Sequence, residues 1–310
     1  MSQFEKSFSF FLQEVREPLL LTICSAGLIG NCLSVIVLTR PRMRRPFSIL
    51  LACLATSDAI AVLTRGVLSA AKIHAKLHPD FECTQFYAYL DLTCRGLFTI
   101  FGRNMNIWMT LGVAAVRYRF ISRMSKSDGI TKKHICLIVL CAFIMSTHIH
   151  LVFFFVPKTS YYEDDCFQLV RFNTDLIDHK EMKVIHIVNI LLPVVLLCVY
   201  TGLIISVICK AEKQRRLLTS QMYIRHHSNQ TLRISVMILI MMSVSMFNVA
   251  ILIVIYLNEF TVLTSPPEVI EVLGDVMFPC LGINCSLDFW LFLLSCEFRE
   301  TLKSLFSRSK

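Results

Sequence analysis

Residues 18–39, PLLLTICSAGLIGNCLSVIVLT, decide the fold because they contain no Asp, Glu, Lys or Arg. A helix of about 20 residues crosses the hydrocarbon core of a bilayer, which is about 30 Å thick. A helix in water needs a polar face, and this stretch is apolar all round, so it is predicted to lie in lipid. Three further stretches of similar length lack the same four residue types: 135–156, 184–209 and 234–258.

Three more stretches are as long and apolar but contain a few charges, which gives seven predicted transmembrane helices. The chain is 55% hydrophobic and only 17% charged, which is too apolar for a soluble domain of 310 residues. We therefore expect an all-α membrane protein, a seven-transmembrane helix bundle that fills residues 1–310 as one domain. The predicted spans are about 18–39, 47–71, 84–121, 133–156, 183–210, 231–257 and 267–294, and a short amphipathic eighth helix follows at about 295–306.

The distribution of charge predicts the orientation in the membrane. The net charge of +9 alone would also suit a nucleic-acid-binding protein. Most Lys and Arg residues, however, lie in the loops after the first, third and fifth spans and in the C-terminal tail, and most acids lie in the opposite segments. The positive-inside rule places the cation-rich segments in the cytoplasm. We expect a multi-pass protein of the plasma membrane, with lipid around it, its N-terminus outside, its C-terminus in the cytoplasm and no nucleic-acid partner.

The cysteines predict one disulfide at the outer side. Most of the 13 cysteines lie within spans, where Cys behaves as a small hydrophobic residue. Cys166 lies in the outer loop between spans four and five, and Cys83 lies just before span three, so a bridge would tie the two together. Cys94 is the alternative to Cys83, although it lies about 16 Å deeper along the helix. Three free thiols also remain open. Cys296, beside the membrane, is a lipidation candidate or an unmodified buried cysteine.

Polar residues within the spans are costly in lipid and therefore indicate function. One set recurs at middle to inner depth, surrounded by apolar neighbours. Two carboxylates and three amides that face one another can hold a sodium ion through oxygen ligands, and the alternative is hydrogen bonding between helices without an ion. The set comprises Asn31 and the four possible sodium ligands Asp58, Asn106, Asn284 and Asp288.

Short motifs across all seven spans resemble those of the rhodopsin-like (class A) G-protein-coupled receptors. Within that family, the stretches 107–118, 273–277 and 295–301 look most like the invertebrate FMRFamide- and myosuppressin-type neuropeptide receptors, and nematode chemoreceptors share much of the pattern. The family motifs are GN at 30–31, LATSD at 54–58, WMT at 108–110, VRY at 116–118, Pro193 and FR at 298–299.

The resemblance implies a receptor, and not an enzyme, that binds an extracellular peptide or small molecule and activates a heterotrimeric G protein. Arg117 and Tyr118 would then contact the G protein. Two positions depart from the family pattern: Val116 replaces the usual acid, and Asp288 begins DFWLF in place of Asn-Pro-x-x-Tyr. No Lys lies in span seven, so no retinal cofactor is expected. A transporter is the less favoured class, because no inverted repeat is present.

The ligand pocket is expected between the outer halves of the spans. Arg65, Arg95 and Arg103 lie there, and Glu271 and Asp275 supply opposite charge. One interpretation is internal ion pairing, such as Arg103 or Arg95 with Asp275. Another is recognition of a small acid by the planar arginine fork. A third is an amidated Arg-Phe neuropeptide whose own Arg binds the carboxylates. We favour this neuropeptide ligand, and a chemosensory receptor for a small acid is the alternative.

Overall fold

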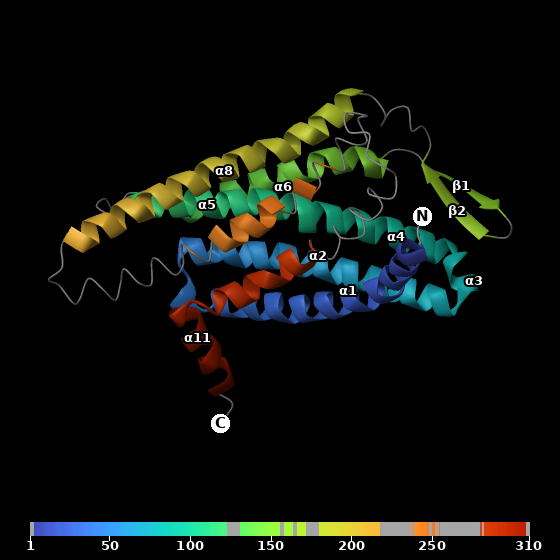
Figure 1. Ribbon diagram of the computed structural model, residues 1–310, viewed down its shortest axis with the longest axis horizontal. Coiled ribbons are helices and arrows are strands. Elements are labelled where there is room, and N and C mark those ends of the chain that lie inside the picture. The colour runs from blue at the N-terminus through green and yellow to red at the C-terminus, as the bar shows by residue number, and fades with distance from the viewer. Residues whose placement is uncertain are drawn as a thin grey trace.

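The computed structural model describes residues 3–122, 131–155, 158–163, 166–171, 180–217, 236, 239–247, 250–251, 254, 280 and 282–307. Parts of the sixth and seventh predicted spans therefore lie outside the described residues. Long helices run side by side along one axis (Figure 1). A strand hairpin projects near one end of this bundle, and helix α11 leaves it at the other. We call these the hairpin end and the α11 end.

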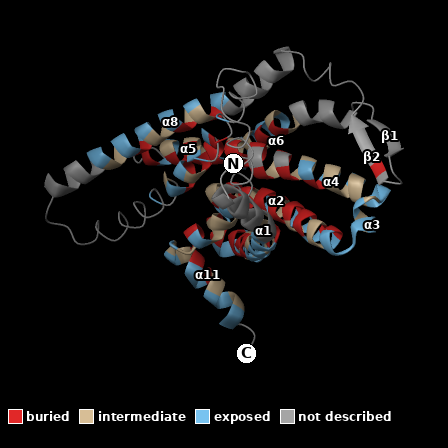
Figure 2. Ribbon diagram, turned by 45° about the vertical axis from the view of Figure 1, so that its right-hand side comes forward, coloured by how far each residue is buried: buried red, intermediate tan, exposed pale blue. Residues whose placement is uncertain are grey.

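The first two spans form an antiparallel helix pair. Helix α1 covers Gln3–Leu38 and helix α2 covers Pro46–Leu77, joined through the short 3-10 turn Pro41–Met43. Both helices are longer than the apolar stretches, because helix-forming polar residues such as Gln13, Glu14 and Arg16 extend the helix beyond the lipid-compatible sequence. Figure 2 shows that many residues of α2 are buried.

The third span contains a change of helix type. Helix α4 covers Gln85–Phe98, the π-helical segment Thr99–Met105 (η2) follows, and helix α5 covers Asn106–Ser122. The sequence of this span predicts a single helix and does not indicate the change at Thr99. A π-helical turn inserts an extra residue and releases backbone carbonyls from the regular ladder, and such turns are frequent at functional sites.

The remaining described helices complete the bundle. Helix α6 covers Lys132–Phe155 and helix α8 covers Lys180–Leu217, and residues 239–247 and 282–292 are also helical. Among the described residues, three helices are long and apolar enough to cross a bilayer: Val15–Leu38, Pro46–Leu77 and Leu191–Lys210. Leu192, Val195 and Val199 of α8 are exposed, which is the pattern of a surface that faces lipid.

Close packing joins α1 to the last span through glycine. A Cβ atom at Gly30 would lie only 2.9 Å from Cβ of Phe289, and one at Gly27 would collide with the Ser286 hydroxyl. Small residues allow helix backbones to approach closely in membranes. The two helices therefore meet at a distance that larger side chains would not permit.

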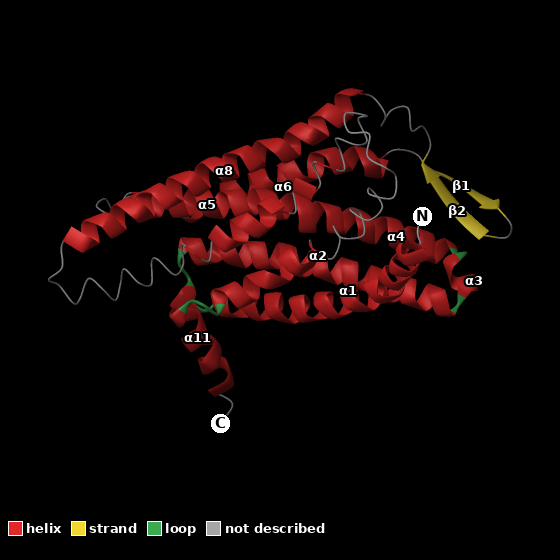
Figure 3. Cartoon of the chain, in the orientation of Figure 1, coloured by secondary structure: helices red, strands yellow, loops and turns green. Residues whose placement is uncertain are grey.

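The loop after α6 forms a β-hairpin, a feature that the sequence analysis did not anticipate in an otherwise helical chain. Strands β1 (Lys158–Glu163) and β2 (Cys166–Arg171) pair antiparallel, with Glu163 opposite Cys166 (Figure 3). Aromatic and β-branched residues in both strands favour this conformation. The Phe167 amide donates a hydrogen bond to the Cys83 carbonyl at 3.0 Å, which anchors the hairpin beside the short helix α3 (Pro79–Glu82).

Helix α11 (Cys296–Ser307) is the amphipathic eighth helix. Its Phe298 is buried against the rings of Phe289 and Phe292, at centroid distances of 6.3 and 5.8 Å. Two exposed ion pairs tie its other side to the turn between α1 and α2: Arg42–Glu300 at 2.7 Å and Arg45–Glu297 at 3.1 Å. The aromatic contacts supply most of the attachment, since exposed ion pairs contribute little.

Candidate functional site

A chain of hydrogen bonds crosses the middle of the bundle. The Asn106 amide on α5 donates to Oδ1 of Asp58 on α2 at 2.8 Å. The Asn284 amide of the last span donates to Oδ1 of Asn106 at 3.1 Å. All three side chains are buried. Asn106 thus links the second and seventh spans by acting as donor and acceptor at once.

Asp288 completes this polar cluster, which we define as Asn31, Asp58, Asn106, Asn284 and Asp288. Its carboxyl group lies within hydrogen-bonding reach of the Asp58 carboxyl group. Asn31 does not contact the carboxylates through its amide nitrogen, which donates instead to the Cys285 carbonyl at 2.7 Å. The structure therefore brings together all four predicted sodium ligands. Asn31 joins them indirectly, through its hydrogen bond to the backbone of Cys285.

The cluster suits a hard cation. Within the described part of the chain, Asn31 Oδ1, Asp58 Oδ2 and Asp288 Oδ2 are buried acceptors without a hydrogen-bond donor. Two adjacent carboxylates in a low-dielectric interior require a shared proton or a cation between them. Oxygen ligands select hard cations. No group of three or more His, Cys, Asp or Glu side chains suited to a metal ion occurs among the described residues.

The π-helical segment η2 brings backbone oxygens beside this cluster. Ser57 donates to the Phe101 carbonyl at 3.1 Å, and the Cys285 thiol donates to the Gly102 carbonyl at 3.7 Å. Both carbonyls belong to η2. The sequence analysis missed Cys285 and these carbonyls. The only signal was the position of Cys285 between Asn284 and Asp288, and a single cysteine in a span is normally a packing residue.

The α11 end holds the residues that the family resemblance assigns to G-protein contact. Arg117 of α5 is buried, with its guanidinium carbon 5.5 Å from the centre of the Phe120 ring. Tyr118 contacts Tyr200 of α8 edge to face at 6.0 Å. An aromatic contact therefore joins the third and fifth spans beside the arginine.

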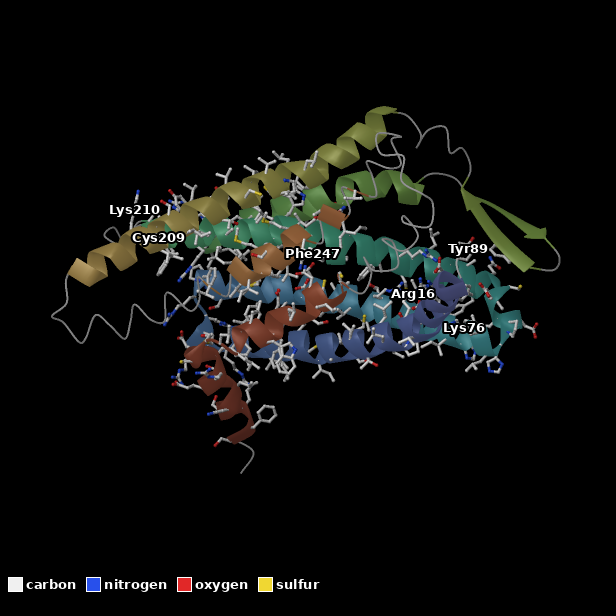
Figure 4. All side chains as sticks on the ribbon, viewed as in Figure 1. Arg16, Lys76, Tyr89, Cys209, Lys210 and Phe247 are labelled. Atoms are coloured by element: carbon white, nitrogen blue, oxygen red, sulfur yellow. The ribbon has the colours of Figure 1, made fainter. Side chains whose placement is uncertain are left out.

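Charged residues gather at the hairpin end, where Figure 4 labels Arg16, Lys76 and Tyr89. Arg65 of α2 is buried and forms an ion pair with Glu17 of α1 at 3.4 Å. Lys72 and Arg16 approach the same carboxylate at 3.6 and 3.2 Å. The sequence analysis missed Glu17, although a buried Arg65 required a partner and Glu17 directly precedes the first charge-free stretch.

The other predicted pocket residues divide into those that the structure describes and those that it does not. Arg95 pairs with Asp91 of the same helix at 2.6 Å and is exposed. The side chain of Arg103 and both predicted acids, Glu271 and Asp275, lie outside the described residues. The predicted pairing of Arg95 or Arg103 with Asp275 therefore stays a prediction.

The cysteines of the hairpin end differ in state. Cys83 is disulfide-bonded, whereas Cys94 is a buried free thiol. The side chain of Cys166 lies outside the described residues, but its neighbour Phe167 is hydrogen-bonded to Cys83. At the α11 end, Cys296 is exposed, and its sulfur accepts a hydrogen bond from Arg299 at 3.2 Å.

Comparison with known proteins identifies this architecture. Residues 19–309 match the family model described as serpentine type 7TM GPCR chemoreceptor Srw. The structure is similar to the crystal structure of squid rhodopsin, with a TM-score of 0.72 and 14% sequence identity, over 95% of this chain and 85% of that one. A comparison with curated proteins found no significant match. The predicted all-α seven-transmembrane fold is confirmed.

Proposed function

The chain belongs to the serpentine 7TM chemoreceptor family Srw and is a G-protein-coupled receptor rather than an enzyme. Within this class, we propose that it couples an extracellular ligand at its hairpin end to a G protein at its α11 end. Arg117 and Tyr118 carry the G-protein contact. The observation that supports this assignment is the position of Arg117, buried against Phe120 at the α11 end beside the Tyr118–Tyr200 contact. A buried guanidinium becomes available to a partner only if the helices around it move, which is what a receptor switch requires.

The orientation and covalent features follow from the same proposal. The hairpin end faces outward and the α11 end faces the cytoplasm of a plasma-membrane protein, in keeping with the positive-inside rule. Cys166 is the disulfide partner of Cys83, since the Phe167–Cys83 hydrogen bond holds the two segments together. Cys296, exposed at the start of α11, is the lipidation site.

The described residues favour a small acidic ligand. At the hairpin end, Arg65, Lys72 and Arg16 converge on Glu17, and Arg95 lies near enough to interact with Arg65 and Lys72 electrostatically. Arginine and lysine side chains are the usual partners of carboxylate groups. A chemosensory receptor for a small acid fits this set of cations.

An amidated neuropeptide is the second candidate ligand. It rests on the resemblance of residues 107–118, 273–277 and 295–301 to FMRFamide- and myosuppressin-type receptors. Such a peptide has a cationic Arg and no terminal carboxylate, so it needs acids in the pocket, and Asp275 and Glu271 are the candidates. The two ligand classes therefore depend on side chains of opposite charge.

We also infer that Asp58, Asn106, Asn284 and Asp288 bind a sodium ion that regulates ligand affinity. The buried acceptor atoms of Asp58 and Asp288 support this assignment. The alternative, a hydrogen-bonded cluster that shares a proton, needs no ion and predicts no specific response to sodium.

The experiment that tests the proposed function is a ligand screen on the purified full-length receptor with a promiscuous G protein. Small carboxylic acids and amidated peptides are scored by stimulation of guanine nucleotide exchange. An acid that acts on the wild type but not on Arg65→Gln supports the first ligand class. A peptide that acts on the wild type but not on Asp275→Asn supports the second. Substrate flux in proteoliposomes without any stimulated exchange would instead indicate a transporter.

A further inference from the structure

Glu17 occupies a position that resembles that of a bound carboxylate ligand. Its side chain is only 3% exposed, and its two oxygens lie 3.2 to 3.6 Å from nitrogens of Arg16, Arg65 and Lys72. Arg65 and Lys72 lie seven residues apart on α2 and thus on the same helix face, with the fully buried Ser69 between them. Arg65 and Lys72 of α2 therefore both bind the carboxylate of Glu17, which belongs to α1.

We propose that Arg65 and Lys72 form a binding subsite for carboxylate groups, that Glu17 occupies it in the ligand-free receptor, and that the carboxylate of an acidic ligand displaces Glu17. The displacement by ligand rests on the proposed receptor function, whereas the carboxylate-binding property of the subsite does not. Glu17 then acts as an internal competitor that sets the concentration at which a ligand acid can bind.

The geometry of the contacts favours exchange. The Arg65–Glu17 contacts are 3.4 Å to each oxygen, longer than the 2.7–2.9 Å of a strong charge-assisted hydrogen bond. Lys72 is also 3.6 Å away and partly exposed, with 20% of its side chain accessible, while Arg65 lies deeper at 4%. An anion that arrives from the hairpin end would meet Lys72 first and Arg65 next.

Helix α1 contains a proline, Pro18, directly after Glu17, at the position where the helix would have to bend for Glu17 to leave the subsite. Proline has no backbone N–H, so the helical hydrogen bond at this position is missing and the preceding turn is more easily bent. The part of α1 that carries Glu17 can therefore move relative to the part that packs against Phe289.

The test is chemical rescue of the full-length receptor in detergent, with acetate as the probe. Glu17→Ala removes a carboxymethyl group, which acetate matches in size and charge. We expect the variant to lose several degrees of unfolding temperature, because Arg65 and Lys72 lose their buried partner. Sodium acetate should restore most of that loss, and sodium chloride at the same concentration should not. The wild type should respond equally to both salts.

Matched controls separate charge recognition from the filling of a cavity. Acetamide has the shape of acetate without its charge and should not rescue Glu17→Ala. Glu17→Gln leaves no space for acetate and should show no rescue, and the double variant Glu17→Ala with Arg65→Gln should lose the rescue. Equal rescue by acetamide, or no rescue by acetate of a folded Glu17→Ala receptor, would overturn the proposal.

If Glu17→Ala unfolds in the absence of acetate, a dialysis experiment replaces the measurement of its unfolding temperature. The variant is purified in acetate and moved into chloride or into fresh acetate. Loss of the monodisperse receptor in chloride alone supports the subsite, and equal loss in both overturns it. If acetate rescues Glu17→Ala but no acid activates the receptor in the ligand screen, receptor activation by acids is rejected and the subsite is retained. If an acid activates the receptor but acetate does not rescue Glu17→Ala, only the subsite is rejected.

Discussion

Asn106 donates a hydrogen bond to Asp58 at 2.8 Å, and this buried contact joins the π-interrupted third span to the second span. The oxygen of the same Asn106 amide group accepts a hydrogen bond from Asn284 at 3.1 Å, so one side chain connects the second, third and seventh spans. Any movement of the third span relative to the seventh must stretch one of these bonds. The polar cluster is thus placed to sense the same helix movements that would expose Arg117.

Replacement of Asn106 by Ala should destabilise the receptor by about 1–3 kcal/mol, because Asp58 and Asn284 would each lose a buried partner. Thermal unfolding in detergent measures the change. Thr56→Ala is the control on α2, since Thr56 is exposed and bonds only within its own helix. Equal effects of the two substitutions would show that the Asn106 bonds do not contribute to stability.

Sodium should raise the unfolding temperature of the wild-type receptor more than potassium at equal ionic strength. A ligand that binds only the folded state stabilises it, and about 2–4 °C is expected for each kcal/mol of binding. Asp58→Asn and Asp288→Asn should each remove the difference between the two salts. If the wild type already responds equally to both, the cluster is a hydrogen-bonded network without a sodium ion.

Gly30→Ala should destabilise the contact between α1 and the last span by about 1–3 kcal/mol, because the new methyl group would lie 2.9 Å from Cβ of Phe289. Gly202→Ala in α8 is the matched control. Apart from the neighbouring backbone of its own helix, no atom lies within 4 Å of its added Cβ, so this substitution should stabilise the helix by about 0.5–1 kcal/mol. The pair is compared by thermal unfolding, and a neutral Gly30→Ala would contradict the close packing.

Phe298→Ala should detach α11 from the bundle, with a loss of about 3–5 kcal/mol if the helix unfolds together with the rest. Phe306→Ala on the same helix is the control, since its side chain is 68% exposed. Hydrogen exchange of α11 backbone amides provides the measurement. Equal protection of the helix in both variants would mean that the two surface ion pairs, and not the aromatic cluster, hold it in place.

The sequence predicted the seven-helix fold because lipid imposes one simple rule, namely that a span must be apolar on every side. It also predicted that Asp58, Asn106, Asn284 and Asp288 would meet, since carboxylates and amides in lipid need one another. It did not predict the π-helical segment at Thr99–Met105, because the length and hydrophobicity that define a span do not distinguish a π-helical turn from a regular one. It missed Glu17 as well, because a residue at the edge of a span looks solvent-exposed until its partner Arg65 is placed.

Guanine nucleotide exchange with the Arg117→Ala receptor tests the central claim most directly. The active ligand from the screen is applied to the wild type, to Arg117→Ala and to Arg119→Ala, an exposed neighbour on the same helix. We predict that all three bind the ligand at the surface of cells, and that stimulated exchange is lost only in Arg117→Ala. Undiminished exchange by Arg117→Ala would contradict the assignment of Arg117 to the G-protein contact.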